Sequence, residues 1–327
     1  MTNTSTAIFI RHFSRKSGAC LLFYRVAHTL GMCHWVIMEF AKLHGLGNDF
    51  LVARVGETGG PPRSLTLLAR QLCDRHCGIG ADGIIFYQPT LGDLEAEVSA
   101  LIYNADGSRA EMSGNGLRCL AALLHKSGQQ SSPALRIRTV SGIKTYVLQG
   151  REGKVYTFES SMGHPITDPQ RVPSRLAPGP EPLLSFPLSV ASEKIAVSLC
   201  SMGNPHCSTF WPDVKRAPLE VLGPLLEKHE GFPNHTNVEF IQVLDRNRIR
   251  VRFWERGVGR TSASGTGSSA AAVAAILNNL VDSPVTVETD LGNMLVRWKF
   301  GEDLFLTGPA EFIFSGVYEE SESSEAP

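Results

Sequence analysis

Two short loops combine serine and glycine in a pattern that can do chemistry. Residues 113–116 read Ser-Gly-Asn-Gly and lead into the apolar run 117–124, and residues 264–267 read Ser-Gly-Thr-Gly and lead into the run 270–277. A loop that opens a helix leaves backbone N–H groups unpaired, and the positive end of the helix dipole points at the same place. Each loop is therefore predicted to hold an anion.

A glycine-rich turn before a helix is more typical of a plain N-cap than of a ligand site, but here it occurs twice. Two further pairs of features accompany it in the same order, each pair about 150 positions apart, which indicates a duplicated domain. The three pairs are Asn48 and Asn204, Asp82 and Asn237, and Ser113 and Ser264. Two related halves that face each other place similar chemistry on the two walls of one cleft.

Hydrophobic periodicity predicts an α+β fold in which each half wraps its strands around one central helix. Helices are expected at 65–76, 117–124, 218–229 and 270–277. Strands are expected at 39–43, 50–53, 84–87, 100–103, within 133–161, and at 195–199, 237–243, 248–254, 285–289, 294–300 and 304–307. The N-terminus of each central helix is expected to face the cleft.

Composition divides the chain into two halves and two terminal extensions. Residues 1–37 contain no Asp or Glu and resemble a transit peptide in composition, although an over-extended start before Met38 is the favoured interpretation. The remaining 290 or so residues suffice for two domains of ordinary size. The predicted division is 38–160 for the N-terminal half, completed by 310–318, then 161–309 for the C-terminal half and 319–327 for a frayed acidic tail.

The overall composition excludes several classes of partner. The chain is 43% hydrophobic and 19% charged with a net charge of −1, so neither a nucleic acid nor a membrane is expected to bind it. The seven cysteines form no disulfide framework, and Cys73 and Cys77 have no second pair that would complete a metal site. No metal is therefore predicted, and a reducing cytoplasm fits the cysteine usage best.

Seven motifs in this order resemble those of the diaminopimelate epimerases, and the resemblance covers Met38 to about Gly316. The motifs are HGLGNDF at 44–50, NADGS at 104–108, GNGLRC at 114–119, MGNPH at 202–206, NVEF at 237–240, ERGVG at 255–259 and LTGPA at 306–310. The resemblance implies two pseudo-symmetric β-rolls, each around a central helix. It also implies an epimerase that interconverts LL- and meso-diaminopimelate without a cofactor, for lysine and peptidoglycan precursor synthesis. A homodimer is left open.

The implied reaction needs a base on one face of the α-carbon and an acid on the other. The α-proton of an amino acid is very weakly acidic, so hydrogen-bond donors in a dry pocket must stabilise the developing negative charge. By resemblance, the two ends of the diamino-diacid substrate are held by Asn48, Asn104, Asn204, Asn237, Glu255 and Arg256. Loop amides come from Gly114, Asn115, Gly265 and Thr266, and His206 and Glu255 tune the acid and the base.

This chain departs from the family pattern at both catalytic positions. The family has a cysteine at each, whereas this chain has Ser113 and Ser264, and it has Arg260 where the family has a glutamate. A thiol has a pKa of ~8.5, and an alcohol whose pKa is about 5 units higher would cost roughly 7 kcal/mol more to ionise. Such a cost removes on the order of 10⁵-fold in rate. An epimerase built on these serines is expected to be slow unless a neighbour activates them.

Other readings of the same residues remain open. A protein that keeps the pocket and binds a diamino-diacid without turnover fits the retained asparagines and the missing cysteines. A hydroxy amino acid dehydratase of related fold is a third possibility. A hydrolase that pairs Ser113 or Ser264 with His206 is disfavoured because neither serine lies in a Gly-x-Ser-x-Gly elbow. Cys77 and Cys119 are expected to be structural.

Overall fold

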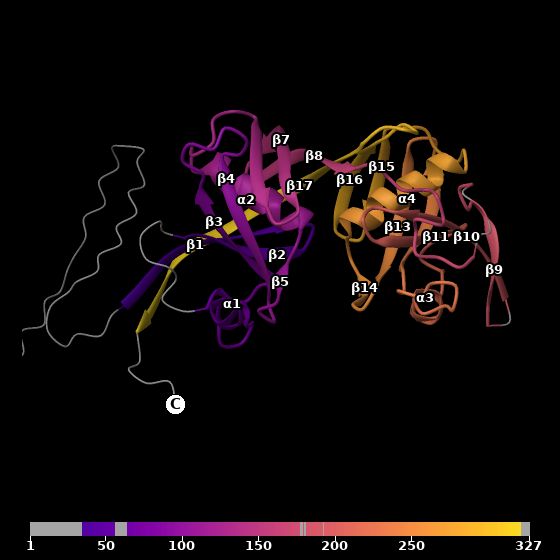
Figure 1. Ribbon diagram of the computed structural model, residues 1–327, viewed down its shortest axis with the longest axis horizontal. Helices are drawn as coiled ribbons and strands as arrows, with labels where there is room; N and C mark the ends of the chain where they lie inside the picture. The colour runs from indigo at the N-terminus through magenta and orange to yellow at the C-terminus, as the bar shows by residue number, and fades with distance from the viewer. Residues whose placement is uncertain (1–34, 56–63, 177–178, 180, 192, 322–327) are drawn as a thin grey trace, which may run out of the picture.

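The chain forms two halves of similar build, joined by a long strand (Figure 1). The computed structural model describes residues 35–55, 64–176, 179, 181–191 and 193–321. Most of the predicted extension at 1–37 and the end of the predicted tail lie outside the described residues. The expected α+β architecture of two pseudo-symmetric β-rolls is confirmed.

The N-terminal half wraps its strands around one central helix. Its strands are β1 (Trp35–Gly45), β2 (Asn48–Arg54), β3 (Gly83–Pro89), β4 (Val98–Asn104), β5 (Arg109–Ala110), β6 (Ala134–Thr139), β7 (Gly142–Glu152) and β8 (Val155–Gly163). The central helix is α2 (Gly114–Lys126), and the shorter α1 (Leu65–Cys73) packs on the outside of β3 and β4.

The C-terminal half repeats this arrangement. Its strands are β9 (Phe186–Val190), β10 (Glu193–Ser201), β11 (Pro205–Phe210), β12 (Asn237–Asp245), β13 (Arg248–Glu255), β14 (Gly259–Thr261), β15 (Val285–Thr289), β16 (Gly292–Arg297) and β17 (Leu304–Ser321). The central helix is α4 (Gly265–Leu277), and α3 (Leu219–Glu227) lies outside.

Strand pairing confirms that the halves are related by a repeat. Strands β2 and β3 are parallel with Phe50 opposite Gly83, and strands β11 and β12 are parallel with His206 opposite Asn237. The later pairs β4–β6 and β13–β15 are also parallel, while β4–β5 and β13–β14 are antiparallel. The offset read from the sequence therefore corresponds to a repeated fold.

Each central helix packs inside its own hydrophobic core. The first core gathers around α2, and a separate one gathers around α4. In α4 the residues from Gly267 to Ala275 are all buried, which suits a helix enclosed by strands on every side. The second glycine of each serine loop makes this fit possible. A Cβ at Gly116 would approach Ile85 to 2.9 Å, and a Cβ at Gly267 would approach Phe253 to 2.9 Å.

Two features join the halves. Strand β17 pairs with β16 as far as Thr307 and with β8 as far as Glu311. From Glu311 onward it pairs with β1, so it crosses from one half to the other (Figure 1). Leu46, in the turn between β1 and β2, is buried in the core that surrounds α4. The halves are therefore held in contact along one side of the space between them.

The structure differs from the predicted elements at several ends. Helix α1 ends at Cys73 instead of extending to residue 76, because the Asp74 carboxylate accepts hydrogen bonds from the backbone N–H groups of His76 and Cys77. Strand β17 continues to Ser321, since it finds a partner in β1, and so includes the first residues of the predicted tail. Strand β16 ends at Arg297 rather than at residue 300, and strands β5, β9, β11 and β14 were not predicted.

Candidate active site

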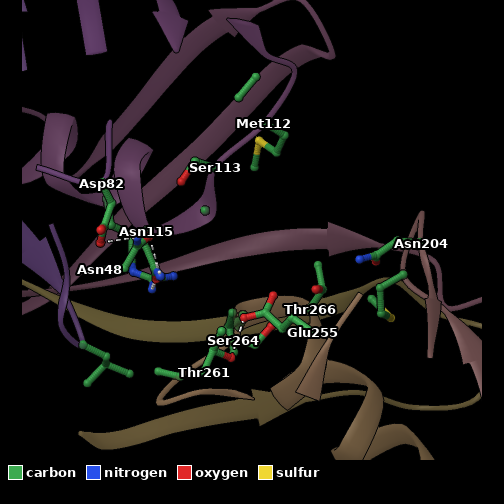
Figure 2. A pocket seen from close by; sticks show the side chains of 18 of the residues that line it. Asn48, Asp82, Met112, Ser113, Asn115, Asn204, Glu255, Thr261, Ser264 and Thr266 are labelled. Carbon is green, nitrogen blue, oxygen red and sulfur yellow. Dashed lines mark hydrogen bonds between the residues drawn. The ribbon is translucent and has the colours of Figure 1, made fainter. Parts of the chain in front are cut away.

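A cavity of about 960 Å³ lies between the halves and is lined by residues from both. The two serine loops meet there from opposite sides: Ser113 begins α2 on one wall and Ser264 begins α4 on the other (Figure 2). The cleft predicted from the repeat is therefore present, and both helix N-termini face it.

Most of the predicted site residues line this cavity. They are Asn48, Asn104, Ser113, Gly114, Asn115, Asn204, Glu255, Ser264, Gly265 and Thr266. Three predicted residues do not line it, namely His206, Asn237 and Arg256. Arg260 does not line the cavity either. It is exposed on β14, where its Nη1 lies 3.2 Å from Glu220 Oε1 and its Nη2 lies 3.5 Å from Asp290 Oδ2.

Both serine side chains cap their own helices. The Ser113 Oγ accepts a hydrogen bond from Gly116 N at 3.1 Å, and the Ser264 Oγ accepts one from Gly267 N at 3.2 Å. This is the usual geometry of a serine N-cap. Among the described residues, neither hydroxyl is hydrogen-bonded to a histidine or a carboxylate that could serve as its base.

The first glycine of each loop leaves space toward the cleft. A Cβ placed on Gly114 would meet no atom within 4 Å, and one on Gly265 would touch only Leu306, at 3.5 Å. Packing of the protein itself therefore does not require glycine at either position. The open backbone at two helix N-termini is suited to the approach of an anionic group.

On the N-terminal wall, a carboxylate and two amides form a chain of hydrogen bonds. Asn48 Nδ2 donates to Asp82 Oδ2 at 2.9 Å, and Asn115 Nδ2 donates to Asn48 Oδ1 at 3.2 Å (Figure 2). Asp82 is held in turn by Arg75 Nη2 at 2.8 Å and by the backbone N–H of Asp49 at 3.1 Å. These contacts hold two predicted substrate-binding residues side by side.

Asp49 anchors this wall from behind. Its side chain accepts hydrogen bonds from Arg75 at 2.7 Å and lies 3.0 Å from the Lys42 ammonium. Burial alone would raise the pKa of the Asp49 carboxyl, but the hydrogen bonds from Arg75 and Lys42 outweigh it and lower the pKa to about 2. The carboxylate is therefore charged throughout the neutral range.

On the C-terminal wall, Glu255 faces the cleft beside Ser264 and Thr266 (Figure 2). Its Oε1 accepts a hydrogen bond from Thr261 Oγ1 at 2.6 Å. The turn that follows is held by the buried Glu227 of α3. This carboxylate accepts hydrogen bonds from Gly257 N at 2.9 Å and from Trp254 Nε1 at 2.8 Å. Glu255 is therefore a carboxylate fixed at the cleft by its own loop.

His206 lies behind Asn204 rather than in the cavity. Its side chain is completely buried, with Nδ1 2.6 Å from Glu239 Oε1 and Nε2 2.9 Å from Asn204 Oδ1. Both ring nitrogens are thus engaged, and neither reaches a serine. Asn237 is likewise satisfied by the backbone, since it donates to Pro205 O and accepts from Arg256 N. These residues hold the wall in place around the cavity.

No described cysteine lines the cavity. Burial raises the pKa of the Cys119 thiol to about 12, and burial with the nearby Asp49 does the same for Cys73. Cys77 is exposed on a turn away from the cleft. The structural role expected for Cys119 agrees with its position in the core around α2, and in the part of the chain that the structure describes no thiol takes the place of the two serines.

Sequence reasoning missed two basic residues at the cavity, Lys144 on its wall and Arg118, which is fully buried directly behind Asn115. Lys144 is half-buried on β7 and shares a strand face with the buried Tyr146, so alternation along the strand could have found it. Within the described residues there is no cluster of His, Cys, Asp and Glu that could hold a metal, and no helix long and apolar enough to cross a membrane.

Comparisons with known proteins show which family the chain is similar to. The family model described as diaminopimelate epimerase matches residues 40–167 and 198–313. A diaminopimelate epimerase from Synechocystis is 44% identical over 283 residues, which cover 86% of this chain and 99% of the relative. One from Pelotomaculum thermopropionicum is 41% identical over 281 residues, with the same shares covered.

Solved structures share the fold at low sequence identity. A phenazine biosynthesis protein of the PhzF family from Bacillus anthracis matches 86% of this chain and 99% of its own, with a TM-score of 0.60 and 14% identity. A hydroxyproline epimerase from Agrobacterium vitis, with trans-4-hydroxy-L-proline bound, matches 88% of this chain and 93% of its own, with a TM-score of 0.57 and 18% identity. With the family model matching most of the chain and both relatives above 40% identity, the chain belongs to the diaminopimelate epimerase family.

Proposed function

We propose that this protein interconverts LL- and meso-diaminopimelate by proton transfer at the α-carbon, without a cofactor and at a low rate. One observation carries the proposal: two helix N-termini open onto one cavity from opposite sides, each with a hydroxyl at its first turn. This arrangement suits a reaction in which both faces of one carbon exchange a proton while amides hold the carboxylate.

The residues that line the cavity are assigned roles accordingly. Ser113 and Ser264 stand at the two positions of proton transfer, and the loop amides at 114–115 and 265–266 receive the α-carboxylate. Amides and carboxylates that can hold the substrate's two ends come from Asn48, Asn104, Asn204 and Glu255. Asn237 and His206 support these groups from the second layer, through Pro205 and Asn204 respectively.

A non-catalytic binding protein is the second candidate, and the same serines favour it. Each Oγ is already used as a helix cap, and among the described residues no base is bonded to either hydroxyl. An unactivated alcohol is a poor proton-transfer group at neutral pH. On this reading the pocket is retained for a diamino-diacid that is bound and released unchanged.

Proton NMR of LL-diaminopimelate with the protein in D₂O tests the proposal. Loss of the α-proton signal together with appearance of the meso isomer is the expected result, and the Ser113→Ala, Ser264→Ala double variant should abolish both. Saturable binding without deuterium uptake would support the binding protein instead. LL-diaminopimelate has no β-hydroxyl to lose, so the dehydratase reaction is tested with a β-hydroxy amino acid, and its conversion to a keto acid with release of ammonia would indicate that reaction.

A further inference from the structure

An arginine inside the N-terminal half is buried without a carboxylate partner. Arg118 lies one turn into α2, and its side chain is completely inaccessible to solvent. No ion pair is formed by it within the described residues, and its Nη1 has no hydrogen-bond partner there. Burial lowers the pKa of the guanidinium. A buried charge without a counter-ion is costly to keep, so its position calls for a function.

The direction of the side chain follows from the helix. Long side chains in a helix point back toward its N-terminus, so that of Arg118 runs toward the loop at 113–116. There Nη2 donates to the side-chain oxygen of Asn115, and Nε donates to Pro309 O of β17 at 3.3 Å. Gly308 makes room for the group, since a Cβ there would lie 3.1 Å from the guanidinium carbon.

Arg118 therefore completes the chain of hydrogen bonds on the N-terminal wall. One end of the chain is a guanidinium, which can only donate, and the other is the Asp82 carboxylate, which accepts. The atom of Asn115 that faces Arg118 must be oxygen, and the atom of Asn48 that faces Asp82 must be nitrogen. The contact between the two amides, Asn115 Nδ2 to Asn48 Oδ1, then has matching polarity.

This matched polarity decides what the wall offers to a ligand. Each Nδ2 uses one N–H within the chain and retains a second, for which the described residues provide no acceptor. Asn48 and Asn115 both line the cavity, so the wall presents N–H donors beside the N-terminus of α2. Asp82 fixes the Asn48 amide from the other end of the chain. Without the donor at Arg118, only the 3.2 Å contact with Asn48 would still orient the Asn115 amide, which could then turn and present oxygen instead.

The opposite wall is built differently. Its Asn204 amide is held by His206, which contacts the buried Glu239. On α4, the residue at the place that matches Arg118 is Ser269, whose Oγ donates to Gly265 O of its own helix at 2.9 Å. Thr266 occupies the place of Asn115, so the described helix α4 has no counterpart of the contact between Arg118 and Asn115.

We propose that Arg118 is a positioning residue that fixes the Asn115 amide, as Asp82 fixes that of Asn48, so that the N-terminal wall donates hydrogen bonds to a carboxylate of the ligand. This rests on the proposed function and deepens it, because it names the group that orients a carboxylate-binding amide of this wall. Arg118 itself does not need to touch the ligand.

Three variants separate positioning from a purely structural role. Arg118→Met removes the charge and the donor at similar length, Arg118→Lys keeps the charge with a single ammonium, and Ser269→Ala is the control on α4. Replacing a buried, unpaired charge by an apolar side chain is often neutral or stabilising, so Arg118→Met is expected to fold and to keep its melting temperature. A structural role would lower the melting temperature of Arg118→Met.

The decisive readout is the side-chain amide spectrum in ¹⁵N-labelled protein. In Arg118→Met, the Asn115 NH₂ signals should move toward positions of freely rotating, solvent-exposed amides, and those of Asn48, which still donates to Asp82, should move less. Arg118→Lys should shift the Asn115 signals less than Arg118→Met does. Ser269→Ala should leave both signals in place. This measurement needs no ligand, so it stands even if the protein turns out not to be an epimerase.

Calorimetry with LL-diaminopimelate supplies the second arm. Its Kd should rise roughly tenfold or more in Arg118→Met, since a misoriented amide presents oxygen to a carboxylate, and should be unchanged in Ser269→Ala. Unaltered amide signals in Arg118→Met, or altered signals with unchanged affinity, would overturn the proposal. If the parent protein does not bind LL-diaminopimelate, only the proposed function fails, and the amide spectra still decide the role of Arg118.

Discussion

Replacing both serines by cysteine should raise the rate of α-proton exchange. Each Oγ lies at the N-terminus of a 13-residue helix, 3.1 Å from Gly116 N in one loop and 3.2 Å from Gly267 N in the other. A thiolate in these places would be stabilised by the same N–H group and by the helix dipole, which lower thiol pKa values. The substitutions Ser113→Cys and Ser264→Cys therefore supply groups suited to proton transfer.

The size of the effect follows from the acidity of the two groups. An alcohol that is about 5 pKa units weaker costs roughly 7 kcal/mol more to ionise, equivalent to ~10⁵-fold in rate. The opposing cost is small, because loss of a serine cap is worth about 1 kcal/mol per helix. The double variant should therefore melt a few degrees lower and exchange the α-proton faster by several orders of magnitude.

The assay is α-proton exchange of LL-diaminopimelate in D₂O, followed by proton NMR, with the single variants and the double alanine variant as controls. Each single cysteine variant should gain much less than the double one, because inversion needs a group on both faces. Arg260 lies outside the cavity, so it need not be changed for the test. A double-cysteine protein that folds, binds the ligand and exchanges no deuterium would refute the reasoning, and would favour the binding protein.

Three further predictions follow from the same geometry. Asn204→Ala should weaken binding of LL-diaminopimelate by about 1–3 kcal/mol in calorimetry, because it removes a polar group that lines the cavity; unchanged affinity would remove Asn204 from the site. Gly267→Ala should lower stability by about 1–3 kcal/mol in denaturant unfolding, since its Cβ would lie 2.9 Å from the Phe253 ring, whereas Gly114→Ala, with open space around it, should not. Despite burial, hydrogen bonds from Arg75 and Lys42 hold the pKa of Asp49 at about 2 in the folded protein, below its ordinary value of 3.8. Its contribution of about 2 kcal/mol to stability is therefore present above pH ~4 and lost as pH falls toward 2. Asp49→Asn should reduce stability at pH 7 and flatten the acid limb of a curve of unfolding free energy against pH, and parallel acid limbs would contradict this.

The sequence by itself determined the repeat, the central helices and the two loops that face each other. The reason is that these features are local: glycine spacing, a serine cap and an apolar run depend on neighbours within one turn of helix. The caps of Ser113 and Ser264 follow directly from the residues in each loop. The family resemblance added the names of the residues that line the cleft.

Only the tertiary structure decided which of those residues reach the cavity. Asn237 and His206 belong to motifs like the others, yet Pro205 and Glu239 hold them behind the wall. Arg118 would be taken for a surface charge on a helix, but β17 returns from the far end of the chain and encloses it beside Gly308. Burial of a charge depends on strands that are distant in sequence, and local spacing carries no information about where those strands pack.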